Sequence, residues 1–147
     1  MSVHQITLEQ KAKVPRKVLF DLLADHENLD RFFRANFSLI KKGNPTSNGI
    51  GAVREVSTGP FTYQEQILDY KENEHLHFKV INGGPVKEYG SWVQFQSVNA
   101  KQSLIHYRIM FTPKVEGTGW LIKFVLEQQL KKALHTLAKH GEAKWQV

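Results

Sequence analysis

Two charged residues, Glu65 and Arg54, are placed where they could form a polar anchor inside an apolar protein interior. Glu65 lies in a segment whose alternate residues Phe61, Tyr63 and Ile67 are aromatic or aliphatic, so it shares their face if the segment is a strand. A carboxylate on such a face must find a partner, take up a proton or border a water-filled space. Arg54 is on the preceding predicted strand, diagonal to Glu65 and within reach of its carboxylate. The pair indicates either a polar anchor in a ligand pocket or a buried ion pair that fixes the strand register.

Hydroxyl groups on the same predicted face add hydrogen-bonding capacity. Three tyrosines and one serine fall there, and a buried tyrosine usually packs its ring while its oxygen finds a partner. The same pattern fits an ordinary core, and that alternative stays open. Phe124, near the start of the last predicted helix, fits either a core position or a ligand contact. The predicted ligand-binding set is Arg54, Tyr63, Glu65, Phe78, Tyr89, Ser91, Tyr107 and Phe124.

The histidines and the lack of cysteine argue against metal or thiol chemistry. His75 and His77 share a strand face, but it is the polar face, and a metal site would need a third ligand nearby. His106 also points outward in the expected register, and a slip of one residue would turn it into the interior as a candidate acid or base. No Gly-x-Ser-x-Gly motif occurs. We therefore expect no metal site and no cofactor, and we assign no catalytic residue.

Length and composition are typical of one globular domain. The chain has 147 residues, of which 41% are hydrophobic and 23% charged, enough to bury a core. We expect one domain over residues 1–147, with no leader and no membrane-spanning segment, and hence a cytoplasmic protein. The net charge of +6 comes from dispersed lysines and arginines rather than from a basic run that could follow a phosphate backbone. Nucleic acid is therefore not an expected partner.

The elements that must position these residues follow from hydrophobic periodicity and turn signals. Alternation predicts a strand over roughly residues 3–12, and helical spacing predicts a short helix from Arg16 to about Leu23, with Pro15 at its start. Asp25 is expected to cap a second short helix. Six strands separated by Gly, Pro and Asn turns are predicted from Phe37 to Thr112, and a long amphipathic helix from Trp120 to about Lys139.

The expected register tests whether these strands share one apolar face. Turns centred on Gly59, Glu72, Gly84 and Lys101 place all predicted partners on the same side of the sheet. These partners are Arg54 with Tyr63, Glu65 with Phe78, Val80 with Tyr89, Phe78 with Ser91, and Phe95 with Tyr107. The opposite face is polar. We therefore predict an α+β fold in which a curved, seven-stranded antiparallel sheet wraps around the long C-terminal helix, with two short helices between strands 1 and 2. We also expect the inner face to enclose a cavity large enough for a ligand.

Three stretches give the sequence a family resemblance: VPRKVLFDLLAD at residues 14–25, GIGAVREV at 49–56 and EQILDY at 65–70. With them the chain resembles the SRPBCC superfamily of START-like, helix-grip proteins, and within it the polyketide cyclase/dehydrase and lipid-transport family. The resemblance implies a hydrophobic cavity between sheet and helix. Plant abscisic-acid receptors of the same superfamily have pocket residues at positions that look like Arg54, Glu65, Tyr89 and Ser91. Their gate-loop sequence is missing here, so hormone binding is not carried over.

Three functional hypotheses follow, and the sequence does not rank the ligands. The first is binding, and with it transport or sensing, of a small hydrophobic or lipid-like molecule in the cavity. The second is a polyketide cyclase or dehydratase in which Glu65 or Tyr89 acts as acid or base. The third is a protein- or membrane-facing module that the positive charge steers to an anionic surface. Whether the protein is an enzyme, and its oligomeric state, stay open.

Overall fold

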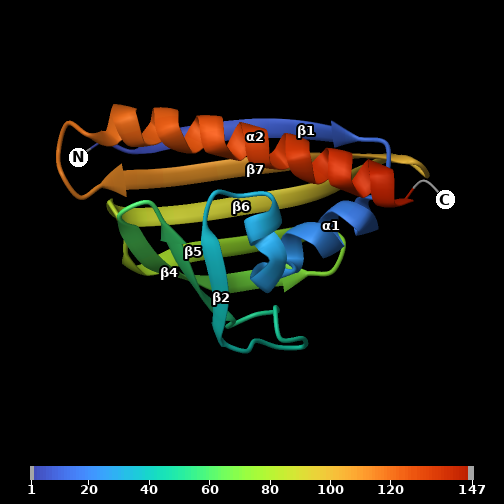
Figure 1. Cartoon of the computed structure of the whole chain (residues 1–147), viewed down its shortest axis with the longest axis horizontal. Helices are drawn as coiled ribbons and strands as arrows, with labels where there is room; N and C mark the ends of the chain where they lie inside the picture. Colours follow the sequence, from blue (N-terminus) through green and yellow to red (C-terminus); the bar gives the residue numbers. More distant parts are fainter. Residues whose placement is uncertain (1, 146–147) are drawn as a thin grey trace.

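A computed structural model describes residues 2–145 (Figure 1). Strand β1 is followed by two short helices, six further strands and one long helix. Their bounds are β1 His4–Ala12, α1 Arg16–Ala24, the 3-10 helix η1 His26–Arg31, β2 Asn36–Lys41, β3 Val53–Thr58, β4 Phe61–Lys71, β5 His75–Gly83, β6 Val86–Asn99, β7 Gln102–Pro113 and α2 Gly119–Trp145.

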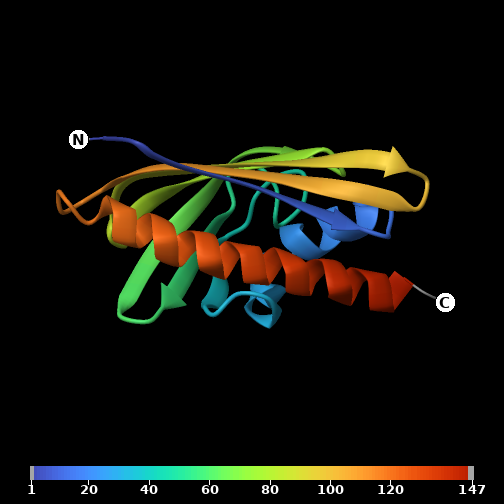
Figure 2. The same ribbon diagram turned by 90° about the horizontal axis from the view of Figure 1, so that it is seen from above.

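The strands form one antiparallel sheet in the order β1-β7-β6-β5-β4-β3-β2. Seen from above, α2 runs along one face of this curved sheet, and α1 lies on the same side near the C-terminal half of α2 (Figure 2). This arrangement confirms the predicted α+β helix-grip fold. Because the strands alternate apolar and polar residues, one side of the sheet packs on the helices and the other faces solvent.

The register agrees with the predicted faces but corrects most of the predicted pairs. Phe78 pairs with Ser91 as expected. The β5–β6 ladder ends at the pair Lys79–Gly90, so the expected pair of Val80 with Tyr89, which would come next, is not formed. Elsewhere the pairing is shifted by two residues. Arg54 pairs with Glu65 rather than Tyr63, Glu65 with Val80 rather than Phe78, and Phe95 with Ile105 rather than Tyr107. Alternation allows registers that differ by two residues. The turn geometry and the two β-bulges of the β4–β5 ladder select one of them.

The helices differ from their predicted form at two places. The second short element is a 3-10 helix, and the side chain of Asp25 does not cap its backbone. The Asp25 carboxylate instead accepts a hydrogen bond of 2.8 Å from the side-chain amide of Asn28. Helix α2 continues past the predicted end at Lys139 to Trp145, because the apolar and small residues that face the core extend to Gly141.

Helix α2 is packed very differently along its length. In its C-terminal half, Leu130, Leu134 and Leu137 are buried in the core. A β-carbon on Gly141 would lie only 3.3 Å from the side chain of Val18, so α1 and α2 approach closely here. By contrast, none of residues 120–129 is buried. The C-terminal half is therefore fixed to the core, while the first three turns lie against it loosely.

Candidate functional site

The candidate site is centred on a buried polar chain of three residues. The Arg54 Nε donates to Glu65 Oε1 over 2.7 Å, and one Arg54 terminal nitrogen lies 2.8 Å from His26 Nδ1. The side chains of Arg54 and Glu65 are only 6% and 4% exposed, and His26 is fully buried. Two charges taken this far from water are stable only when paired and hydrogen-bonded, and here each has the other as its partner.

The neighbours of His26 define its protonation state. Because an arginine only donates hydrogen bonds, Nδ1 must be the acceptor, and the proton sits on Nε2. The Nε2–H group then donates to the carbonyl of Asn48 over 3.1 Å. Burial first, and the positive charge of Arg54 second, lower the pKa of His26 to about 3. His26 is therefore neutral at physiological pH and orients the guanidinium.

Aromatic rings complete the surroundings of Arg54. The guanidinium carbon lies 4.6 Å from the ring centroid of Phe78 and 5.4 Å from that of Phe37. Both distances fall within the range of cation–π attraction. The guanidinium is held from three sides, by Glu65 on β4, by His26 on η1 and by rings on β2 and β5. A side chain held this way presents its remaining N–H groups in a fixed direction.

The three predicted tyrosines surround this pair and remain protonated. Burial first, and the carboxylate of Glu65 in addition, raise the pKa of Tyr63 and of Tyr107 above the usual value of a phenol. Burial likewise raises the pKa of Tyr89, followed by its proximity to Tyr107 and Glu65. Neutral phenols can donate a hydrogen bond to a carbonyl or carboxylate oxygen. The site thus combines several neutral donors with one ion pair.

Ser91 lies close to these phenols and is completely buried. Within residues 2–145, its hydroxyl oxygen has no hydrogen-bond partner. A buried hydroxyl without a partner is unfavourable, and such groups commonly mark a place for water or ligand. Ser91 is, however, not among the residues that line the cavity described next.

A cavity of about 70 Å³ lies between the sheet and α2. Six of the eight predicted residues line it: Arg54, Tyr63, Glu65, Phe78, Tyr89 and Tyr107. On the helix side it is bounded by Leu126, Gln129 and Leu130. Exposed Arg34 and Gln129 mark where the lining reaches the surface. The cavity has less than half of the ~150 Å³ that suffices for a benzene molecule in an engineered protein core, so it is smaller than we expected from the sequence.

The structure places Phe124 outside the cavity wall, and its ligand contact stays a prediction. Its side chain points to solvent and does not line the cavity. In the first two turns of α2 every side chain except that of Lys123 is apolar, so the spacing of apolar residues does not identify the inner face there. The neighbours Ile122 and Leu126, which continue the phase of Leu130 backwards in steps of four, are the ones that pack against the core.

His26 is the site residue that sequence reasoning missed. It begins the 3-10 helix η1, directly after α1, and belongs to no apolar face that the sequence predicts. A signal was nevertheless present, because Leu19, Leu22, Leu23 and His26 continue the spacing i, i+3, i+4, i+7 of a buried helix face. A histidine in the next place of such a series is a candidate for burial next to a charged partner.

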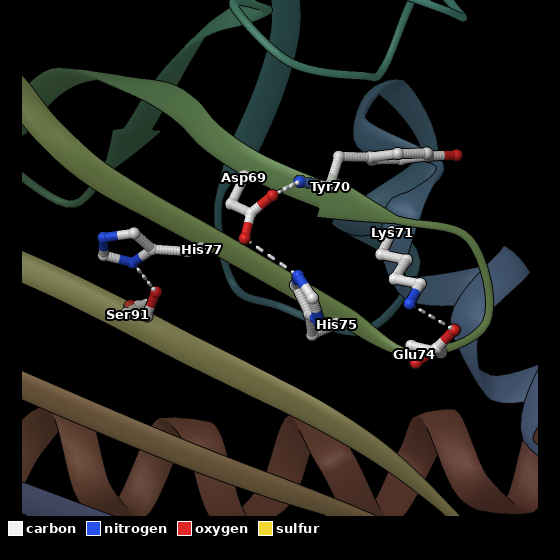
Figure 3. A network of polar contacts seen from close by, with 7 residues as sticks. All are labelled: Asp69, Tyr70, Lys71, Glu74, His75, His77 and Ser91. Atoms are coloured by element: carbon white, nitrogen blue, oxygen red, sulfur yellow. Dashed lines mark hydrogen bonds and ion pairs between the residues drawn. The ribbon is translucent and has the colours of Figure 1, made fainter.

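The outer face of the sheet carries a separate set of polar contacts (Figure 3). His75 Nε2 lies 2.8 Å from Asp69 Oδ2, and His77 Nδ1 donates over 2.8 Å to the carbonyl of Ser91. His106 also stays on this face, where Nε2 lies 2.7 Å from Gln96 Oε1. Within the part of the chain that the structure describes, no group of three or more His, Cys, Asp or Glu side chains is arranged to hold a metal ion.

Comparison with known proteins places these observations in a family. A family model described as polyketide cyclase / dehydrase and lipid transport matches residues 3–142. No curated protein matches the sequence at a significant level.

No helix within residues 2–145 has the length and apolar character needed to span a bilayer.

Solved structures share the fold at low sequence identity. The Zhui aromatase/cyclase from Streptomyces sp. R1128 is 12% identical with a TM-score of 0.82, over 97% of this chain and 96% of that one. A START superfamily protein from Mycobacterium smegmatis is 11% identical with a TM-score of 0.78, over 96% of both chains. Ara h 8.0201 is 15% identical with a TM-score of 0.77, over 97% of this chain and 99% of that one.

Proposed function

Because the chain belongs to the polyketide cyclase / dehydrase and lipid transport family, we propose that it binds a small, mainly apolar molecule between the sheet and α2. The observation that carries this proposal is the buried Arg54–Glu65 pair on the wall of a mainly aromatic and aliphatic cavity. A few convergent polar groups in an apolar pocket are typical of ligand sites, where they orient one polar end. The phenols and Arg54 favour a ligand that offers a carbonyl, carboxylate or hydroxyl oxygen.

The volume of the cavity constrains how such a ligand is bound. About 70 Å³ accommodates a few water molecules or a small fragment. A larger ligand requires the cavity to widen. The first turns of α2 are the element that can yield, since Leu126 and Gln129 border the cavity on a stretch with no buried residue. The proposal therefore includes an outward displacement of these turns when ligand enters.

A cyclase or dehydratase activity is the second candidate, favoured by the protonated phenols. A neutral phenol can donate a hydrogen bond to a ketone oxygen, although the raised pKa of Tyr89 opposes full transfer of its proton, and a nearby carboxylate can accept a proton from carbon. In this scheme Tyr89 is the acid and Glu65 the base. The Glu65 carboxylate is already bonded to Arg54 Nε over 2.7 Å, so a proton transferred to it would leave the buried guanidinium without its charged partner. This geometry favours binding over catalysis.

Native mass spectrometry of the purified protein tests the proposal directly. A bound small molecule that is lost on denaturation supports binding, and its conversion during incubation to a product lighter by one water supports the dehydratase. Tyr107→Phe is expected to weaken binding of that molecule about fivefold to tenfold, since it removes one hydrogen bond. His75→Gln on the outer face is the matched control. Equal affinity of wild type and Tyr107→Phe would count against this cavity as the site.

A further inference from the structure

The start of α2 and the loop before it expose a cluster of large apolar side chains. Trp120 is 68% exposed and Phe124 is 61% exposed, and Leu121, Val125 and Val115 are also exposed. We call these five residues the helix-start patch. Single exposed hydrophobic residues are ordinary, but a contiguous group on two helical turns marks an interaction surface.

The helix-start patch covers the side of α2 that faces away from the core. Trp120 and Phe124 are four residues apart, as are Leu121 and Val125, so each pair lies on one stripe of the helix. Lys131 and Lys132 follow Phe124 and Val125 by seven residues on the same stripes, and both are exposed. The outward side of α2 therefore changes from apolar at its start to basic two turns later.

Two neighbouring turns add apolar side chains at the same end of the molecule. The β3–β4 hairpin, the β5–β6 turn and the β7–α2 loop lie at one end (Figures 1 and 2). The backbone of Lys114 donates to the carbonyl of Pro85 over 3.0 Å, which joins the last two. Phe61 at the first turn and Ile81 at the second are both exposed. Three separate segments thus present large apolar groups around the start of α2.

We propose that this end of the molecule docks on an anionic phospholipid bilayer. Trp and Phe insert at the boundary between headgroups and acyl chains, and lysines beside them pair with lipid phosphates. Lys114, Lys123, Lys131 and Lys132 flank the patch along the chain and outnumber the two glutamates of the same stretch, Glu116 and Glu127, and the whole chain carries a net charge of +6. A second copy of the chain would bring the same positive charge to the contact, which disfavours a dimer through this surface.

The proposed docking does not require the cavity ligand, but the docking surface lies next to the cavity. Leu126 and Gln129, which line the cavity, directly follow the patch along α2. A molecule that leaves a bilayer at this surface would meet the cavity within two helical turns. Binding to vesicles can be measured without any cavity ligand, so failure of either proposal leaves the other standing.

Vesicle co-sedimentation tests the docking. The full chain is mixed with vesicles of phosphatidylcholine alone or with about one third phosphatidylserine, at low and high salt. We expect binding to the anionic vesicles, weakened several-fold in about 0.5 M salt because the lysine attraction is screened. The double variant Trp120→Ala/Phe124→Ala is expected to bind anionic vesicles about tenfold or more weakly than the wild type. Trp145→Ala, an exposed tryptophan at the other end of α2, is the matched control and should bind as wild type.

Three results would overturn the proposal. The first is no binding to anionic vesicles at low salt. The second is binding that the double variant leaves unchanged although its circular dichroism and thermal melt show it folded, since charge alone would then explain the binding. The third is a wild-type dimer in analytical ultracentrifugation that the double variant dissociates, which would assign the patch to a second copy.

Discussion

Arg54 and Glu65 face each other directly across the β3–β4 ladder, with Nε and Oε1 2.7 Å apart and both side chains almost fully buried. Each is therefore the main compensation for the charge of the other. His26 and the rings of Phe37 and Phe78 hold the arginine but bring no negative charge. This dependence makes the pair the most sensitive polar element of the fold.

Breaking the pair from one side should cost more than removing both charges. We expect Arg54→Met or Glu65→Leu alone to lower the free energy of unfolding by about 3–5 kcal/mol, because one buried charge is left uncompensated. The double variant should lose less than the two single losses added together. Urea melts of the three variants measure the coupling, and strictly additive losses would contradict a coupled pair.

Lowering the pH should destabilise the protein through His26. Folded His26 stays neutral down to about pH 3, whereas an unfolded histidine takes up a proton near pH 6.5. Between these values the unfolded state binds more protons, so stability falls as the pH falls. From pH 7.5 to 5.5 the wild type should lose about 1.4 kcal/mol more than His26→Gln. Urea melts at both pH values decide this, and equal losses would show that His26 is protonated when folded.

Ser91→Ala separates a ligand role from a structural one. Since the hydroxyl is buried without a partner among the described residues, its removal should leave the free energy of unfolding unchanged or raise it by up to about 1 kcal/mol. Affinity for a molecule found by native mass spectrometry should fall if that molecule reaches the hydroxyl. A clear loss of stability in urea melts would mean that Ser91 already has a partner, such as ordered water or the neighbouring phenol of Tyr89 or Tyr107.

Gly83 and Gly59 form a matched pair for testing the β-turns. Both have positive φ, 82° and 55°. A β-carbon on Gly83 would clash with the carbonyl oxygen of Thr62, whereas one on Gly59 would meet nothing within 4 Å. Gly59→Ala should cost about 1 kcal/mol from backbone conformation alone, and Gly83→Ala distinctly more. Equal losses in urea melts would mean that the β5–β6 turn shifts to make room.

The sequence predicted the fold and the polar and tyrosine residues on the sheet side of the cavity wall, because both depend on alternation. A period of two assigns each strand residue to a face, and any shift by two residues leaves that assignment intact. Tyr63, Tyr89 and Tyr107 were therefore placed correctly at the cavity even though several predicted partners were wrong. Alternation does not specify the geometry of the turns, and that geometry decides which of the registers two residues apart is formed.

The remaining errors arise where the chain has no strand periodicity. His26 lies on a 3-10 helix, and its partner Arg54 comes from a distant segment, so only tertiary packing reveals the contact. Phe124 is one of several apolar residues in the first turns of α2. There, more than one face of the helix has apolar residues at helical spacing, so the pattern does not identify the buried face. The loose packing of these turns was equally hidden, because a sequence records which residues are apolar but not how closely the sheet approaches them.

The pairing of β1 with β7 has a consequence for the order in which this protein can fold. His4 pairs with Phe111 and Ala12 with Ser103, so the first strand finds its neighbour only in the last one. During synthesis the hairpins from β3 to β6 can form as they emerge, whereas β1 stays without a partner until β7 is complete. Ile6 then remains exposed for most of translation, and closure of the β1–β7 ladder becomes a late, long-range step.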